Sequence, residues 1–208
     1  MKRRMKIRDA MRGAAAVAAL FFGLAEAAFA QTEKPAGGQQ EGLKVHGHWT
    51  IDIKNPDGTL LRRHEFQNAL EPAGGLKLAN FLARRSAPGL WSVYLYSPSG
   101  TPACHPGSAA CVLSEDRELN FAIGALTVDV PTSGPNQGRL VLTGSFNSPD
   151  GRSFFRALSG VSECAIGSPG CLTGGNLQFT MKDFAPIPPV QAGQIVQVTV
   201  VIFFSSGP

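Results

Sequence analysis

The stretch KVHGHWTIDIK (44–54) decides the fold class. Its odd-numbered positions, such as Val45, Trp49 and Ile51, are apolar, whereas even-numbered positions such as His48 and Asp52 are polar. Successive side chains of a β-strand point to opposite faces, so this alternation is typical of a strand with one buried face. The chain therefore begins its folded part with a half-buried strand.

The turn NPDG (55–58) follows at once, and TLLRRHEF (59–66) resumes the extended pattern. Proline presets the dihedral angle of one turn position and glycine adopts a positive φ at another, so we predict a β-hairpin. The similar stretch SPDG (148–151) predicts a second hairpin, which would join strands 138–147 and 152–160.

Three histidines, His46, His48 and His64, lie on the first hairpin. Three converging imidazoles would bind zinc or copper. If Lys54 pairs with Thr59, however, His64 lies on the face opposite to the other two, unless a one-residue bulge shifts the register. We therefore treat His46 and His48 only as weak metal candidates, and we expect no cofactor.

The same alternation recurs along the rest of the chain, interrupted once by helical spacing in GGLKLANFLARRS (74–86). Together with the hairpin, it predicts eight strands at 44–54, 59–66, 90–97, 119–130, 138–147, 152–160, 176–184 and 194–204. Such spacing predicts a mainly β fold: a single antiparallel β-sandwich, immunoglobulin-like or jelly-roll-like, with one short amphipathic helix. A closed barrel is the alternative.

Residues 1–30 have the composition of a secretory signal peptide, with a basic start, a short apolar run and an Ala28-Phe29-Ala30 cleavage site. Residues 31–42 lack large apolar side chains and are expected to form a flexible leader. The β-sandwich domain would then span 43–208. We expect a secreted protein, extracellular or periplasmic, with no stable membrane span after cleavage.

Charge argues against nucleic acid as a partner. The whole chain has 19 Lys and Arg and 15 Asp and Glu, of which six and two lie in residues 1–30. The remaining 178 residues therefore hold thirteen of each kind. A neutral domain without a basic stripe attracts a phosphate backbone only weakly.

The four cysteines form two similar stretches, CHPGSAAC (104–111) and CAIGSPGC (164–171). Six intervening residues do not match the ligand spacing of a zinc knuckle, and no C-x-x-C redox motif is present. In an oxidising compartment such cysteines form disulfides. Of the three connectivities, local pairing is favoured, Cys104 with Cys111 and Cys164 with Cys171.

These two loops suggest a recognition surface. If both lie at one end of the sandwich, His105 would be part of that surface. Tyr94 and Tyr96 share one face of the strand 90–97, opposite to Trp91. Two tyrosines on an exposed face can stack on sugar rings or contact a protein.

Local catalytic motifs, among them G-x-S-x-G, H-E-x-x-H and the Walker loop, are absent from the sequence. Dispersed carboxylates of the glycosidase kind need no local spacing. Five acidic residues lie on predicted strands or directly beside one: Asp52, Glu65, Glu118, Asp129 and Asp183. Nothing selects any pair of them, so no catalytic residue is assigned and we expect a protein that is not an enzyme.

A short pattern resembles phage-tail-associated proteins. Phe66-x-Asn68-x-Leu70 is followed by Gly74-Gly75 and a short helix, and Ala192-Gly193-Gln194 precedes a long apolar strand. The resemblance covers about a third of the chain. It implies a secreted β-sandwich used for assembly or surface recognition, with no catalytic residues to carry over.

Taken together, the sequence predicts a secreted, non-catalytic structural or assembly protein, with a protein partner or self-assembly as its mode of action. The alternatives are a carbohydrate- or protein-binding module, and a hydrolase with dispersed carboxylates. Self-assembly could use the last strand, 194–204, donated to a neighbouring subunit.

Overall fold

The computed structural model describes residues 43–98, 104, 110–116, 122–149, 151–168, 171 and 178–206, all within one compact unit, Gln39–Pro208. The expected signal peptide and leader lie outside the described residues. The described part holds nine strands and one helix. In chain order they are β1 (Leu43–Lys54), β2 (Leu60–Leu70), α1 (Pro72–Leu82), β3 (Ala87–Tyr96), β4 (Ala110–Ser114), β5 (Ala122–Asp129), β6 (Leu140–Asn147), β7 (Arg156–Cys164), β8 (Gln178–Asp183) and β9 (Ile195–Ser206).

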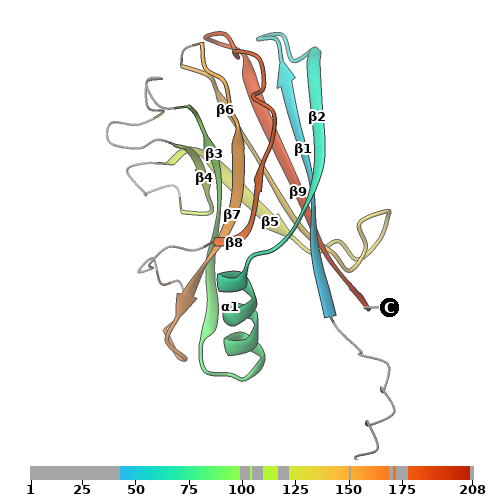
Figure 1. Ribbon diagram of the computed structural model, residues 1–208, viewed down its shortest axis with the longest axis vertical. Coiled ribbons are helices and arrows are strands. Elements are labelled where there is room, and N and C mark those ends of the chain that lie inside the picture. Colours follow the sequence, from blue (N-terminus) through green and yellow to red (C-terminus); the bar gives the residue numbers. More distant parts are fainter. Residues whose placement is uncertain are drawn as a thin grey trace, which may run out of the picture. The chain divides into compact units, whose positions relative to one another are not determined.

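The strands form one closed barrel in the order β1-β2-β8-β7-β3-β4-β5-β6-β9, after which β9 returns to β1 (Figure 1). The predicted β-sandwich is therefore wrong, and the closed barrel is the observed fold. The last strand makes the difference, because β9 pairs with β1 on one side and with β6 on the other. A sandwich and a barrel need the same inward and outward alternation, so the sequence pattern alone does not distinguish them.

The strand β4 is not visible in the sequence pattern, because all five of its residues are buried and none alternates with a polar one on an exposed face. It pairs antiparallel with β3 and parallel with β5. That parallel pairing completes the ring.

The first hairpin forms as predicted, but its register differs by two residues. Trp49 lies opposite Phe66 and Ile51 opposite His64, with an irregularity between Ile53 and Lys54. A shift of two residues leaves every side chain on its predicted face. His64 therefore lies on the inner side, as Ile51 does.

The second predicted hairpin is wrong, because β6 and β7 are not neighbours in the barrel. Segment 148–155 instead crosses one end of the barrel, where Arg152 and Val190 exchange backbone hydrogen bonds with N–O distances of 3.1 and 2.7 Å. The long connection from β8 to β9 lies beside it.

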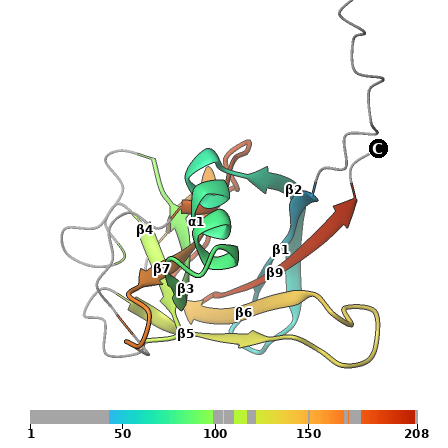
Figure 2. The ribbon, with the colours of Figure 1, turned by 90° about the horizontal axis from the view of Figure 1, so that it is seen from below.

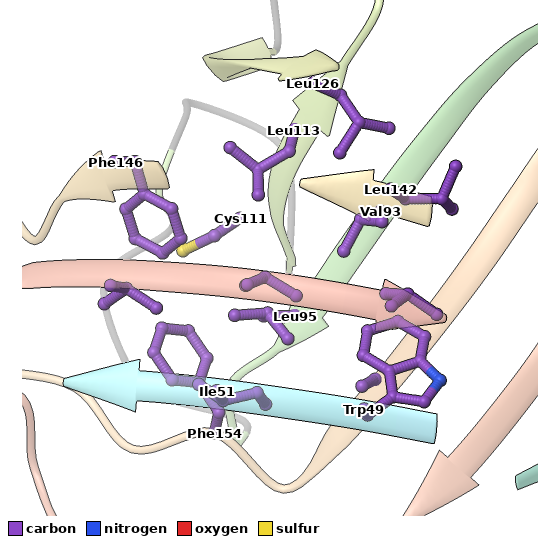
Figure 3. Packing of buried hydrophobic residues seen from close by; sticks show 14 of the residues in the cluster. Trp49, Ile51, Val93, Leu95, Cys111, Leu113, Leu126, Leu142, Phe146 and Phe154 are labelled. Carbon is purple, nitrogen blue, oxygen red and sulfur yellow. The ribbon is translucent and has the colours of Figure 1, made fainter. Parts of the chain in front are cut away.

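The barrel interior holds the hydrophobic core (Figure 3). The inward side chains of β1 are Val45, Gly47, Trp49, Ile51 and Ile53, and all of them are buried. The indole of Trp49 stacks on the ring of Phe66, with 5.6 Å between centroids. Phe66 in turn stacks on Phe184, at 5.0 Å.

Candidate functional site

One end of the barrel is fully packed. We call it the closed end and define it by Phe154, Ile187 and Val190, whose side chains come from the two segments that cross it. These three side chains are at most 1% exposed. Backbone hydrogen bonds fasten the two segments together, including one from the Ile187 N–H to the Phe154 carbonyl, at 2.8 Å.

The opposite end is different. We call it the open end and define it by Leu43, Val130 and Phe204, which continue the inward-facing series of β1, β5 and β9. Despite this orientation they are 59%, 55% and 48% exposed. These three side chains therefore form an exposed apolar rim at this end, whereas the next inward residues, such as Val45 and Ile202, are buried.

The helix α1 covers only part of the open end. It contacts β8 and β3, and the view from below places it over β3 and β7, away from β1 and β9 (Figure 2). Its side chains Leu78 and Phe81 pack against the core, whereas Leu82 is exposed. The helix thus adds a further apolar side chain to this end.

The carboxylate of Glu163 on β7 holds α1 in place. Its Oε1 accepts hydrogen bonds from Asn80 Nδ2 at 2.9 Å and from Ser86 Oγ at 2.7 Å. Lys77 Nζ lies 3.7 Å from Oε2. These hydrogen bonds, Ser86 first and then Asn80, lower the pKa of Glu163, so the carboxylate is ionised at neutral pH.

Polar atoms lie one row inside the rim of the open end. Asn68 on β2 faces Gly47 on β1, next to Trp49. The Trp49 Nε1, the Asn68 Nδ2 and the Asn68 Oδ1 are buried, and none has a hydrogen-bond partner among the described residues. Such atoms are rare in folded proteins, where buried donors and acceptors are nearly always paired with protein groups, water or a ligand.

The geometry at Gly47 shows that these atoms converge. A Cβ added there would overlap Asn68 Oδ1 and would lie 3.2 Å from Trp49 Nε1. The two polar groups therefore point into the same small region above the glycine. We call Gly47, Trp49 and Asn68 the polar anchor.

His64 lies two inward rows farther from the open end, opposite Ile51. Its Nε2 is also buried without a partner among the described residues. Burial, followed by the charge of Arg62, lowers the pKa of His64, which keeps its imidazole neutral at pH 7.

The predicted metal candidates lie elsewhere. His46 and His48 face outward on β1, where the ring of His46 stacks on Phe203 with 5.4 Å between centroids. The inward-facing His64 is on the other side of the sheet. Among the described residues, no group of three potential ligands is arranged to hold a metal ion.

The tyrosines lie on the outer face of β3, as the alternation predicts. Tyr94 and Tyr96 stack with 6.4 Å between centroids, and both are half-buried. Burial raises the pKa of Tyr94. The third residue of the predicted recognition surface, His105, lies outside the described residues.

Both predicted disulfides are confirmed. Cys104 and Cys111 have Cα atoms 5.0 Å apart, and Cys164 and Cys171 have Cα atoms 5.6 Å apart. The guanidinium of buried Arg152 lies against the first pair, with Nη1 3.3 Å from Cys111 Sγ. This disulfide therefore adjoins the closed end. The Cys164–Cys171 disulfide begins at the last residue of β7, at the open end. Two disulfides are typical of an oxidising environment.

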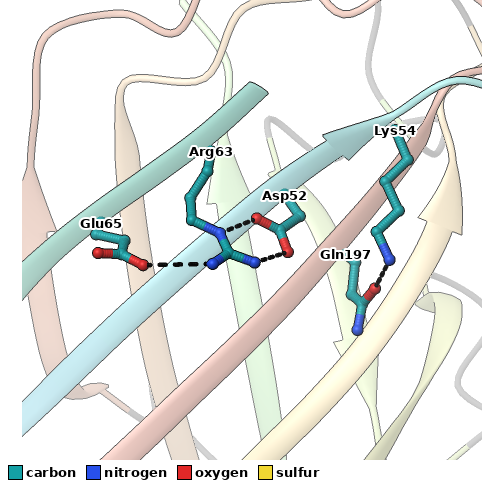
Figure 4. Close-up of polar contacts among 5 residues, drawn as sticks. All are labelled: Asp52, Lys54, Arg63, Glu65 and Gln197. Carbon is teal, nitrogen blue, oxygen red and sulfur yellow. Dashed lines mark hydrogen bonds and ion pairs between the residues drawn. The ribbon is translucent and has the colours of Figure 1, made fainter. Parts of the chain in front are cut away.

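Three of the five carboxylates that the sequence singled out lie beside arginines on the outer face. Asp52 accepts two hydrogen bonds from Arg63, at 2.7 and 2.9 Å, and Glu65 lies 3.9 Å from the same guanidinium (Figure 4). Asp183 forms an ion pair with Arg156, which lowers the pKa of Asp183. Asp129 is exposed next to the open end, and Glu118 lies outside the described residues.

A depression of about 370 Å³ lies along β5 and is lined by Ala122, Ile123, Gly124 and Ala125. These four residues bring no titratable or nucleophilic side chain to it. We therefore assign no chemistry to this depression.

In the sequence, the polar anchor is marked by two residues that interrupt the apolar inward series of their strands. Asn68 occupies the inward series of β2 between Phe66 and Leu70, so it is a polar residue at an apolar position. The matching signal on β1 is Gly47, between Val45 and Trp49. Only the observed register shows that the two residues face each other.

Within the part of the chain that the structure describes, no helix is both long and apolar enough to cross a membrane. No protein-family model, no curated protein and no solved structure matches this chain. The resemblance to phage-tail-associated proteins therefore stays a prediction, and the functional argument rests on the chain's own geometry.

Proposed function

We propose that this protein is an exported, non-catalytic binding module that takes a small apolar molecule into the open end of its barrel. The observation that carries the proposal is the exposure of inward-facing Leu43, Val130 and Phe204 at the open end. Export is supported by the signal-like N-terminal sequence and by the two disulfides.

Small-molecule sites are concave, largely apolar and often lie in the mouths of β-barrels. Exposing the side chains of the open end to water is unfavourable by about 25 cal/mol per Å² of apolar surface, so a ligand that covers them gains affinity. The rest of the described core is packed, so the surface that the ligand would contact is already formed.

Assembly by donation of the last strand is disfavoured by the closed sheet. The strand β9 is hydrogen-bonded on both edges within the chain, and removing it would expose the edges of β1 and β6. Assembly through an outer face stays a prediction that the barrel neither requires nor opposes.

The test uses the neutral fluorescent probe N-phenyl-1-naphthylamine, titrated into the purified chain that lacks residues 1–30. We expect saturable binding of one probe per chain. The substitution Phe204→Asp should weaken it about tenfold, a loss of about 1.4 kcal/mol, because a carboxylate would face the apolar ligand.

The matched control is Leu60→Asp, since Leu60 is 52% exposed but pairs with Lys54, which lies on the outward series of β1. This variant should bind the probe as the parent chain does. Equal weakening by both substitutions, or no saturable binding by the parent chain, would contradict the proposal. Far-UV circular dichroism confirms that both variants are folded.

A further inference from the structure

We infer that the polar anchor binds the polar head group of the ligand, and that this head group is neutral and both donates and accepts hydrogen bonds, as a primary carboxamide or a hydroxyl does. The inference rests on the proposed function, because it concerns the same open end. It adds the chemical class of the ligand: a small amphipathic molecule with an aliphatic body.

The first argument is burial without a partner. Asn68 is 6% exposed and Trp49 is fully buried, yet the Asn68 carboxamide and the Trp49 N–H have no hydrogen-bond partner among the described residues. A buried donor or acceptor left unpaired is destabilising, so a fold retains such a group where something else pairs with it.

The second argument is position. Phe204 at the rim lies opposite Val45, and Gly47 is the next inward residue of β1, about 7 Å farther along the strand. Asn68 lies directly opposite Gly47. A molecule whose aliphatic part contacts the rim can therefore reach the anchor with its terminal group.

The third argument is charge. On β1, β2 and β9 the inward neighbours of the anchor are Val45, Phe66, Leu70 and Ile202, which are all apolar. A carboxylate bound among them would lose its hydration without gaining a counter-ion from these strands, which is unfavourable. A neutral group loses far less and can pair with both the donors and the acceptor of the anchor.

The donors and the acceptor of the polar anchor also limit the chemistry of the ligand's head group. Trp49 Nε1 only donates, whereas the Asn68 side chain donates through Nδ2 and accepts through Oδ1. A ligand carboxamide can accept from Nδ2 or Nε1 with its oxygen and donate to Oδ1 with its nitrogen. A hydroxyl supplies one donor and two acceptor positions, so it can satisfy the anchor in a similar way.

The test compares ligands of equal chain length by displacement of N-phenyl-1-naphthylamine at pH 8. We expect 1-octanol and octanamide to bind about tenfold more tightly than octanoate, which is ionised at this pH. Asn68→Leu, which has a similar size without polar atoms, should remove this preference.

Two further variants make the assignment specific. Gly47→Ala places a methyl group where Asn68 Oδ1 lies, so it should also abolish the preference. Gln67→Leu on the outward face of β2 is the control and should keep it. In Trp91→Phe, where Trp49 is the only tryptophan left, octanamide should shift the indole emission.

The outcomes separate the two proposals. If the probe binds but Asn68→Leu keeps the full preference for the neutral ligands, the head-group assignment fails and the proposed function stands. If octanoate competes as well as octanamide, or if the Trp49 emission is unchanged on saturation, a buried water alone satisfies the anchor and the inference is overturned. If no probe binds, the proposed function itself fails.

Discussion

The two ends of the barrel are built from the same strands but differ in what covers them. At the closed end, the segments around Phe154 and Val190 hydrogen-bond to each other and fill the interior. At the open end, α1 covers one side, and inward-facing Phe204 remains half exposed. The comparison indicates that the closed end contributes more to stability, whereas the open end leaves apolar side chains exposed.

The largest expected effect comes from emptying the closed end. Phe154→Ala should lower the free energy of unfolding by about 3–5 kcal/mol, because it removes a fully buried ring and leaves a cavity. Phe204→Ala at the open end should cost less than about 1 kcal/mol. Urea denaturation followed by tryptophan fluorescence measures both, and similar values for the two variants would refute the contrast.

Removing the disulfides tests the same contrast between the closed end and the open end, with a smaller expected effect on stability. The chain-entropy estimate is about 2.5 kcal/mol for a closed loop of this length. The double substitution of Cys104 and Cys111 by serine should cost more than that of Cys164 and Cys171, because Cys111 belongs to the core and contacts Arg152. Melting temperatures in the absence of reductant give the order, and the reverse order would count against a stability role for the closed end.

The smallest expected effect is a pH-dependent loosening of α1. The pKa of Glu163 is lowered below its ordinary value of 4.5, so its stabilising contribution is complete above that pH. The contribution is lost as the pH falls through the lowered pKa, because the protonated carboxyl accepts hydrogen bonds from Ser86 and Asn80 more weakly and no longer pairs with Lys77. Hydrogen exchange of α1 should then accelerate relative to that of segment 184–194.

Glu163→Gln serves as the control for this prediction. It keeps an acceptor for Asn80 and Ser86 but cannot ionise, so exchange of α1 should become insensitive to pH in the acid range. A helix that loosens with the same pH profile in this variant would show that another group is responsible.

Much of the fold could be predicted from local pattern. The alternation in 44–54 identified the inward face of β1, and the NPDG turn identified the hairpin. The cysteine spacing correctly predicted both disulfides. These features depend on neighbours in the sequence or on one face of one element, which is the information that a pattern contains.

Features that depend on distant pairing could not be predicted in this way. The choice between sandwich and barrel depends on β9 pairing with both β1 and β6. The polar anchor depends on a register that brings Asn68 over Gly47. The two-residue difference from the expected hairpin register has two sources: Lys54 pairs with Leu60 instead of Thr59, and the irregularity between Ile53 and Lys54 adds one more residue. The turn at 148–151 was misread because its chemistry suits a crossing segment as well as a hairpin.

The pairing of the first strand with the last also has a consequence for the time course of folding. Thr50 lies opposite Thr199, so the barrel cannot close until nearly all of the described chain is available. Contacts of such long range are formed slowly, since loop closure must precede the gain from pairing. A chain that closes its barrel late stays unfolded while it is being synthesised, which would favour the export that we propose.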